Sequence, residues 1–192
     1  MARNGFYFDQ DSCLGCRVCQ IACKDVNDLP IGSLFRKVNT YETGEYPNAD
    51  RYHFAGTCNH CENPACVNNC PTGAMHVSED GTVQHDDERC IGCRACAIAC
   101  PYDVPVYFED EGIVKKCTTC QDKRDEWGNP PCVAACMMRV LDFGDMDELR
   151  KKYGSDLVKE LPILPSASIT DPSTLIHPRK SALSPDFVET PI

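Results

Sequence analysis

Sixteen cysteines, in four groups of four, are the residues of this 192-residue chain whose type and spacing indicate chemistry. The first and third groups read C-x2-C-x2-C-x3-C, the second C-x2-C-x4-C-x3-C and the fourth C-x2-C-x11-C-x3-C. Cysteines this dense either form disulfides or bind metal as thiolates. The groups are Cys13, Cys16, Cys19 and Cys23; Cys58, Cys61, Cys66 and Cys70; Cys90, Cys93, Cys96 and Cys100; and Cys117, Cys120, Cys132 and Cys136.

Three kinds of site compete for these thiols. Disulfides fit the even count, but the N-terminal MARNGFYFDQD contains no secretory signal, which disfavours an oxidised framework. Zinc sites join two pairs of ligands from distant segments, whereas here three cysteines fall within seven residues. The run C-x2-C-x2-C-x3-C-P is typical of bacterial ferredoxins, in which the fourth cysteine ligates the other cluster. At four thiolates per cluster, the sequence predicts four [4Fe–4S] clusters.

In two-cluster ferredoxins, the fourth cysteine of each group ligates the cluster held by the other group. We therefore expect the groups of this protein to exchange their fourth cysteines in pairs. The second and third groups are close in sequence, and AMHVSEDGTVQHD between them predicts a hairpin with Asp80 and Gly81 near its turn. We therefore expect these two groups to pair with each other, and the first group to pair with the fourth. The predicted ligand sets are Cys58, Cys61, Cys66 with Cys100; Cys90, Cys93, Cys96 with Cys70; Cys13, Cys16, Cys19 with Cys136; and Cys117, Cys120, Cys132 with Cys23.

These ligand sets must be positioned by an α+β fold of two ferredoxin-like 2[4Fe–4S] units, one inserted in the other, with an extended C-terminal tail. Residues 1–45 and 111–155 would form the outer unit, and residues 46–110 the inner unit. GFYFD and RYHFAGT predict short strands before the first two groups. Pro64 and Pro131 are placed to open helices, while Asp145 and Gly154 are expected to cap and stop another.

The last segment, residues 156–192, lacks apolar periodicity and is punctuated by prolines. Two interpretations remain open: a disordered tail, or an extended arm that contacts a partner. The number of apolar residues favours the arm, because a tail in solvent has no use for them. These residues are Leu161, Ile163, Leu164, Leu175, Ile176, Leu183 and Phe187.

Composition and motifs narrow the function further. A net charge of −10 argues against nucleic-acid binding, and no run of apolar residues is long enough to span a membrane. No nucleophile–base pair, phosphate-binding loop or dinucleotide motif is present, so we expect no catalytic residues and a chain that carries electrons without being an enzyme. His60 is expected to pack rather than ligate. Basic residues beside the ligands are candidates to raise cluster potentials: Arg17, Lys24, Arg94, Lys115, Lys116 and Arg139.

Five stretches of the sequence resemble the iron–sulfur electron-transfer subunits of the dimethyl sulfoxide reductase family, in the molybdopterin oxidoreductase group. They are CxGCxxCxxACKD at 13–25, CNHCENPAC at 58–66, CPTGAMH at 70–76, CIGCRACAIACPY at 90–102 and LDFGDMDELRKKYG at 141–154. The last is specific because it holds no ligand. In one departure, Met137 follows Cys136 where the family usually has proline.

The resemblance implies two partners: a molybdopterin catalytic subunit and a membrane anchor that oxidises quinol. It further implies a peripheral membrane complex used in anaerobic respiration, on the extracytoplasmic face by way of the catalytic subunit's twin-arginine signal, with a cytoplasmic location as the alternative. The alternative functions are a free-standing soluble polyferredoxin or the ferredoxin subunit of another redox complex, such as a hydrogenase. The terminal substrate is not encoded in this chain.

Overall fold

A computed structural model describes residues 3–190 as a mixture of short helices and short strands. The strands are β1 (Asn4–Asp9), β2 (Lys37–Thr43), β3 (Asp50–Gly56), β4 (Met75–Val77), β5 (Val83–His85), β6 (Val106–Phe108), β7 (Ile113–Lys115), β8 (Leu141–Asp145), β9 (Thr174–His177) and β10 (Val188–Thr190). The helices are α1 (Val18–Val26), α2 (Ala65–Asn68), α3 (Ala95–Ala99), α4 (Gln121–Trp127), α5 (Pro131–Ala134) and α6 (Met146–Tyr153), with 3-10 turns η1 (Ala167–Ile169) and η2 (Lys180–Leu183).

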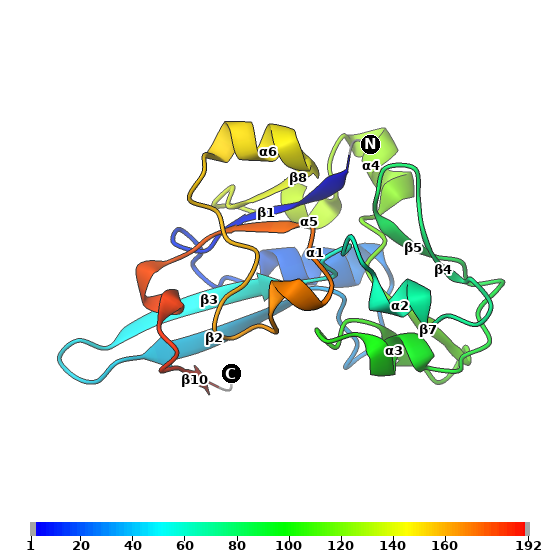
Figure 1. The fold of residues 1–192 in the computed structure, drawn as a ribbon, viewed down its shortest axis with the longest axis horizontal. Helices are drawn as coiled ribbons and strands as arrows, with labels where there is room; N and C mark the ends of the chain where they lie inside the picture. Colours follow the sequence, from blue (N-terminus) through cyan, green and yellow to red (C-terminus); the bar gives the residue numbers. More distant parts are fainter. Residues whose placement is uncertain (1–2, 191–192) are drawn as a thin grey trace.

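The strands form two three-stranded sheets and two hairpins. In one sheet, of order β8-β1-β9, β1 runs antiparallel to β8 and parallel to β9. The other sheet has the order β10-β2-β3 and is antiparallel throughout. The β4–β5 and β6–β7 hairpins lie together with α2 and α3 at one end of the molecule, and the β2–β3 hairpin projects at the opposite end (Figure 1).

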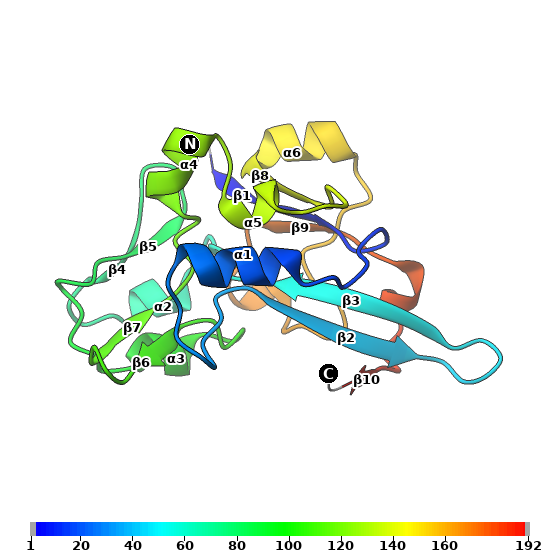
Figure 2. The ribbon, with the colours of Figure 1, turned by 180° about the vertical axis from the view of Figure 1, so that it is seen from behind.

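Each helix that carries cysteines packs against another such helix. Helix α1, with Cys19 and Cys23, packs against α5, while α2 packs against α3 at the other end of the fold. Figure 2 shows α1 lying between the β2–β3 hairpin and α5. Six of the cysteines belong to the main apolar core, together with side chains such as Phe6, Phe8 and Leu141, and Cys13 packs against it. Cysteine side chains thus form part of the hydrophobic core of this protein, which has few other apolar residues for its size.

Most local elements predicted from the sequence are present. GFYFD lies in β1, RYHFAG lies in β3, and β4 and β5 pair as the antiparallel hairpin with its turn at Asp80 and Gly81. Pro131 is the first residue of α5, as expected, whereas Pro64 is the residue before the first turn of α2. The helix after β8 begins and ends as predicted: the Asp145 carboxylate accepts hydrogen bonds from the first-turn amides, and Gly154 ends α6 at φ 92°.

The β2–β3 hairpin spans the boundary that the sequence places between residues 45 and 46. All seven residues of β2 pair with β3, and the boundary falls in the loop that joins them. A continuous sheet therefore connects the segment of the first cysteine group with that of the second. In the described residues, no helix is long and apolar enough to cross a membrane.

The C-terminal segment packs on this protein's own core. Strand β9 pairs in register with β1, so that Ile176 lies beside Phe8, and β10 extends the β2–β3 sheet. Leu161, Leu175 and Ile176 are at most 3% exposed. A disordered tail does not describe residues 156–190, and these apolar side chains are buried without any partner. Contact of this segment with another protein stays a prediction.

Candidate iron–sulfur sites

The cysteine loops are built from alternating left-handed residues. In the first group, Gly15 and Arg17 have φ of 65° and 63°, and in the third, Gly92 and Arg94 have φ of 66° and 61°. Such alternation turns successive backbone N–H groups toward one side, which creates a concave site for an anion. Glycine is required at Gly92 for a second reason: a Cβ there would lie 2.0 Å from the Gly112 carbonyl oxygen. The loops are thus shaped to enclose a negatively charged group.

The thiols of the second and third groups line two separate enclosed spaces. Each space receives three cysteines from one group and the fourth from the other, because α2 and α3 pack side by side and carry the last thiol of each group across. One is lined by Cys58, Cys61, Cys66 and Cys100, and the other by Cys70, Cys90, Cys93 and Cys96.

The first and fourth groups are brought together in the same manner by α1 and α5. A third enclosed space is lined by Cys117, Cys120 and Cys132 of the fourth group and by Cys23 of the first. Burial is the main cause of the raised pKa of Cys13. Among the thiols, Cys136 makes the largest contribution to this rise. Three of the predicted sets thus each line one space, and the assignment of all sixteen cysteines as cluster ligands stays a prediction.

Burial dominates the electrostatics of these thiols. It raises the pKa of Cys58 to about 12, and those of Cys19, Cys96 and Cys120 to about 11. Neighbouring thiols add to each of these shifts, since thiolates repel one another. A set of four thiolates is stable in such surroundings only with a cation among them, and the iron of a cluster supplies that charge.

Cys70 differs from the other cysteines. Burial acts to raise its pKa, but hydrogen bonds from the Met75 and Ala74 amides and from Thr72 outweigh burial and lower it. The Met75 N–H lies 3.5 Å from the Cys70 sulfur. Amide donors to a ligand sulfur are one of the means by which a protein sets a cluster's potential.

Further donors face the sulfurs of the first and fourth groups. The Thr119 N–H lies 3.4 Å from the Cys117 sulfur, where Thr119 and Cys120 both have positive φ. The Asn27 side-chain amide lies 3.7 Å from the Cys120 sulfur and 3.9 Å from that of Cys23. Asn27 thus contacts one thiol of each group.

The arrangement fits clusters better than single metal ions. Across residues 3–190, no three His, Cys, Asp or Glu side chains converge closely enough to hold one ion. The cysteines instead surround a space, as a cubane with an iron at each thiolate requires. The residues present therefore suit iron–sulfur clusters.

Two buried polar residues, His60 and Lys116, lie next to the ligands. His60 is fully buried and accepts a hydrogen bond from the Val83 N–H at its Nδ1, and burial lowers its pKa well below the usual range. It packs as a neutral ring, as expected. Lys116, alone of the six basic residues selected from the sequence, is buried; its ammonium donates to the Val83 and Cys117 carbonyl oxygens.

Arg36 is the functional candidate that the sequence did not indicate. Its side chain is 1% exposed, and the thiols of Cys19, Cys23, Cys117 and Cys132 are near enough to influence its ionisation. No motif marks it, because its burial arises only in the fold, where Nη1 donates to the Ala55 carbonyl oxygen and the guanidinium lies over the Phe6 ring. The chain leaves the fourth cysteine group without a proline. Met137, which follows Cys136, is 68% exposed, and the backbone turns through Arg139 at φ 55°.

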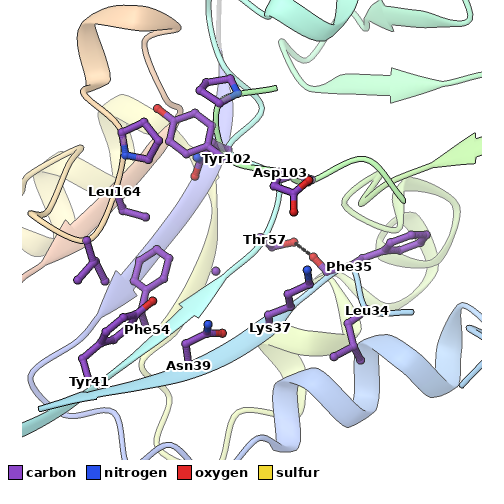
Figure 3. A pocket seen from close by; sticks show the side chains of 16 residues that line it. Leu34, Phe35, Lys37, Asn39, Tyr41, Phe54, Thr57, Tyr102, Asp103 and Leu164 are labelled. Atoms are coloured by element: carbon purple, nitrogen blue, oxygen red, sulfur yellow. Dashed lines mark hydrogen bonds between the residues drawn. The ribbon is translucent and has the colours of Figure 1, made fainter. Parts of the chain in front are cut away.

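A cleft of about 340 Å³ lies outside the cysteine sets (Figure 3). Lys37, Asn39 and Tyr41 of β2 line one side, and Tyr102 and Asp103 face them, with the Thr57 hydroxyl donating to the Phe35 carbonyl oxygen at 2.9 Å. The described residues that line it include no cysteine, histidine or serine.

The paired, loop-enclosed cysteine sets define an iron–sulfur protein of the ferredoxin type. In agreement, residues 49–146 match the family described as "4Fe-4S dicluster domain" and residues 10–28 the one described as "4Fe-4S binding domain". These families support several [4Fe–4S] clusters in the protein.

Comparison with whole proteins identifies the family. The sequence is 45% identical to the B subunit of anaerobic dimethyl sulfoxide reductase from Escherichia coli K12, over 93% of this protein and 90% of that one. It is 42% identical to the corresponding B subunit of Haemophilus influenzae, over 95% and 92% of the two proteins. It is 41% identical to the thiosulfate reductase electron transfer subunit PhsB of Salmonella typhi, over 73% and 74%. The protein belongs to the family of dimethyl sulfoxide reductase B subunits, and it is an iron–sulfur electron-transfer subunit.

Proposed function

We propose that this protein carries four [4Fe–4S] clusters in two ferredoxin-like units, one inserted in the other, and that electrons pass along all four. The ligand sets are those exchanged between the second and third groups and between the first and fourth. The observation that carries the proposal is that three spaces are each lined by the four cysteines of one predicted set.

The proximity of thiols from different sets supports one linear order of clusters. Burial is the main cause of the raised pKa of Cys19, and Cys132 of the fourth group contributes to it. In the same way, Cys117 contributes to the raised pKa of Cys58, and Cys66 to that of Cys96. The clusters of the first, fourth, second and third groups would thus follow one another in a series.

The first and the last site of this series each have a cysteine at the surface. Cys16 of the first group and Cys93 of the third are the two exposed cysteines. Apolar side chains surround both: Leu14 and Ile21 near the first, and Ile91 and Ile98 near the second, each at least 60% exposed. Exposed apolar groups beside a redox centre suit a docked protein that gives or takes the electron. We therefore assign entry and exit of electrons to these two loops.

The partners we propose are a molybdopterin catalytic subunit at one end and a membrane anchor that oxidises quinol at the other. The relatives named as parts of a dimethyl sulfoxide reductase support this assignment. The protein would then function in a peripheral membrane complex, exported with its catalytic partner, and in anaerobic respiration. Each transfer adds one electron to a cluster and removes it again, so this subunit makes and breaks no substrate bond.

The test is anaerobic purification from the native host through a tag on this subunit, followed by metal analysis of the main peak. Stoichiometric molybdenum or tungsten, together with about four irons for each of four clusters, supports the proposal. Iron alone on a monodisperse protein of 21.3 kDa would instead indicate a free-standing polyferredoxin. A peak with iron and a different redox partner would assign the protein to another complex.

A further inference from the structure

Arg36 is a charged side chain in the interior whose charge no carboxylate balances. It is 1% exposed, and among the described residues it forms no ion pair. Arginine stays protonated in proteins, so the cation cannot escape its desolvation cost by losing a proton. An unpaired buried charge costs several kcal/mol, which requires a compensating anion nearby.

The geometry of the guanidinium leaves most of its donors without a protein acceptor. Nη1 donates to the Ala55 carbonyl oxygen at 2.8 Å, and the guanidinium carbon lies 4.9 Å from the centroid of the Phe6 ring. Nε and Nη2 are buried and have no hydrogen-bond partner in the described part of the sequence. These two nitrogens carry three N–H groups.

The groups around Arg36 belong to two cluster sets. The Phe6 ring beneath the guanidinium also lines the space that Cys23, Cys117, Cys120 and Cys132 surround, which is the set of the fourth group. In agreement, thiols of that set and Cys19 of the first group's set both act on the ionisation of Arg36. A [4Fe–4S] cluster with four thiolates has a total charge of −2 when oxidised and −3 when reduced. The anion that the buried guanidinium needs is therefore provided by the clusters on either side of it.

We propose that Arg36 is a positioning residue that sets the potentials of the two clusters of the outer unit, through its fixed, buried charge and its unpaired N–H groups. The inference rests on the proposed function, because it requires both clusters. Reduction adds one electron to a cluster and one negative charge beside a cation already in place. The reduced form is stabilised, and the midpoint potential rises in consequence.

The experiment compares Arg36→Gln and Arg36→Lys in the purified complex by redox titration followed by EPR. The control is Arg51→Gln, which removes the same charge from an exposed residue of β3 that pairs with Glu42. Signals of the outer clusters are identified with Cys16→Ser and Cys120→Ser. We expect Arg36→Gln to reduce the ratio of reduced to oxidised outer clusters at least tenfold at fixed potential, a shift of about 59 mV for one electron.

The inner clusters should keep their potentials within a few-fold, and Arg36→Lys and Arg51→Gln should fall close to the wild type. Equal potentials in Arg36→Gln and Arg51→Gln, with full iron, would overturn the proposal. If Arg36→Gln loses the outer clusters, restoration of full iron by Arg36→Lys supports a need for charge, whereas loss in both variants would assign Arg36 to packing alone and overturn it. Failure of the proposed function is distinguishable, because the wild type itself would then lack four clusters or a redox partner.

Discussion

Exchange of the fourth ligand is tested by replacing Cys70, the last cysteine of the second group. Cys70 lines the space enclosed by Cys90, Cys93 and Cys96 rather than the one enclosed by its own group. In Cys70→Ser the third group's cluster keeps three of its four thiolates, and the iron without a thiolate is the one most readily lost. We expect iron to fall by about one in sixteen, with all the sulfide retained, because a cubane that loses one iron leaves a three-iron core.

EPR of the complex identifies which cluster has changed. A three-iron core is paramagnetic when oxidised, so one new signal appears in the oxidised sample and one of the reduced-state signals disappears. The matched controls are Cys93→Ser, which lies in the third group without ambiguity, and Cys61→Ser, which lies in the second. The signal lost in Cys70→Ser should be the one altered in Cys93→Ser. If it coincides with the one altered in Cys61→Ser, each group keeps its own fourth cysteine and the reasoning is refuted.

Three further predictions concern stability, each measured by thermal unfolding of the cluster-loaded protein against the wild type. Ile176→Ala removes a side chain 1% exposed in β9 and should cost about 2–5 kcal/mol; an effect below about 1 kcal/mol would mean that the C-terminal segment is not part of the core. Asp145→Ala removes the N-cap of α6 and should cost about 1 kcal/mol, with Asp147→Ala as the control of equal charge; equal losses in both would contradict the cap. Burial acts to raise the pKa of Asp80, but hydrogen bonds from Ser78, Thr82 and Arg124 outweigh it and hold the pKa well below the usual range. That stabilisation is fully present above the unfolded pKa of about 4 and is lost only as the pH falls below it. Asp80→Asn should therefore cost about 1–3 kcal/mol of stability, equally at pH 6 and pH 8. A cost that differs between these two pH values would disprove the assignment.

Local elements could be predicted wherever residues close in sequence determine them. The hairpin at Asp80, the proline at the start of α5 and the cap at Asp145 each depend on a few adjacent residues, and each is present. A ferredoxin-type spacing also predicts exchange between the groups, and the lining of three spaces agrees with it, while the full ligand assignment stays a prediction.

Features that depend on contacts distant in sequence could not be predicted. Strand β9 is four residues long and pairs in parallel with β1, more than 160 residues away in the sequence, so no local pattern announces it. The β2–β3 hairpin is a local element, but only its second strand was expected from the sequence, so the predicted division between residues 45 and 46 falls in its loop. Arg36 stands alone in sequence, and its burial depends on contacts with Phe6 and Ala55 that no motif indicates.

The most direct test of four clusters in one electron-transfer series is the determination of iron, acid-labile sulfide and reduced-state spin on the anaerobically purified complex. After subtraction of the partner's own clusters, the account predicts about 16 irons and 16 sulfides per copy of this subunit, with up to four spins on full reduction. Eight irons, or full occupancy by zinc, would contradict it.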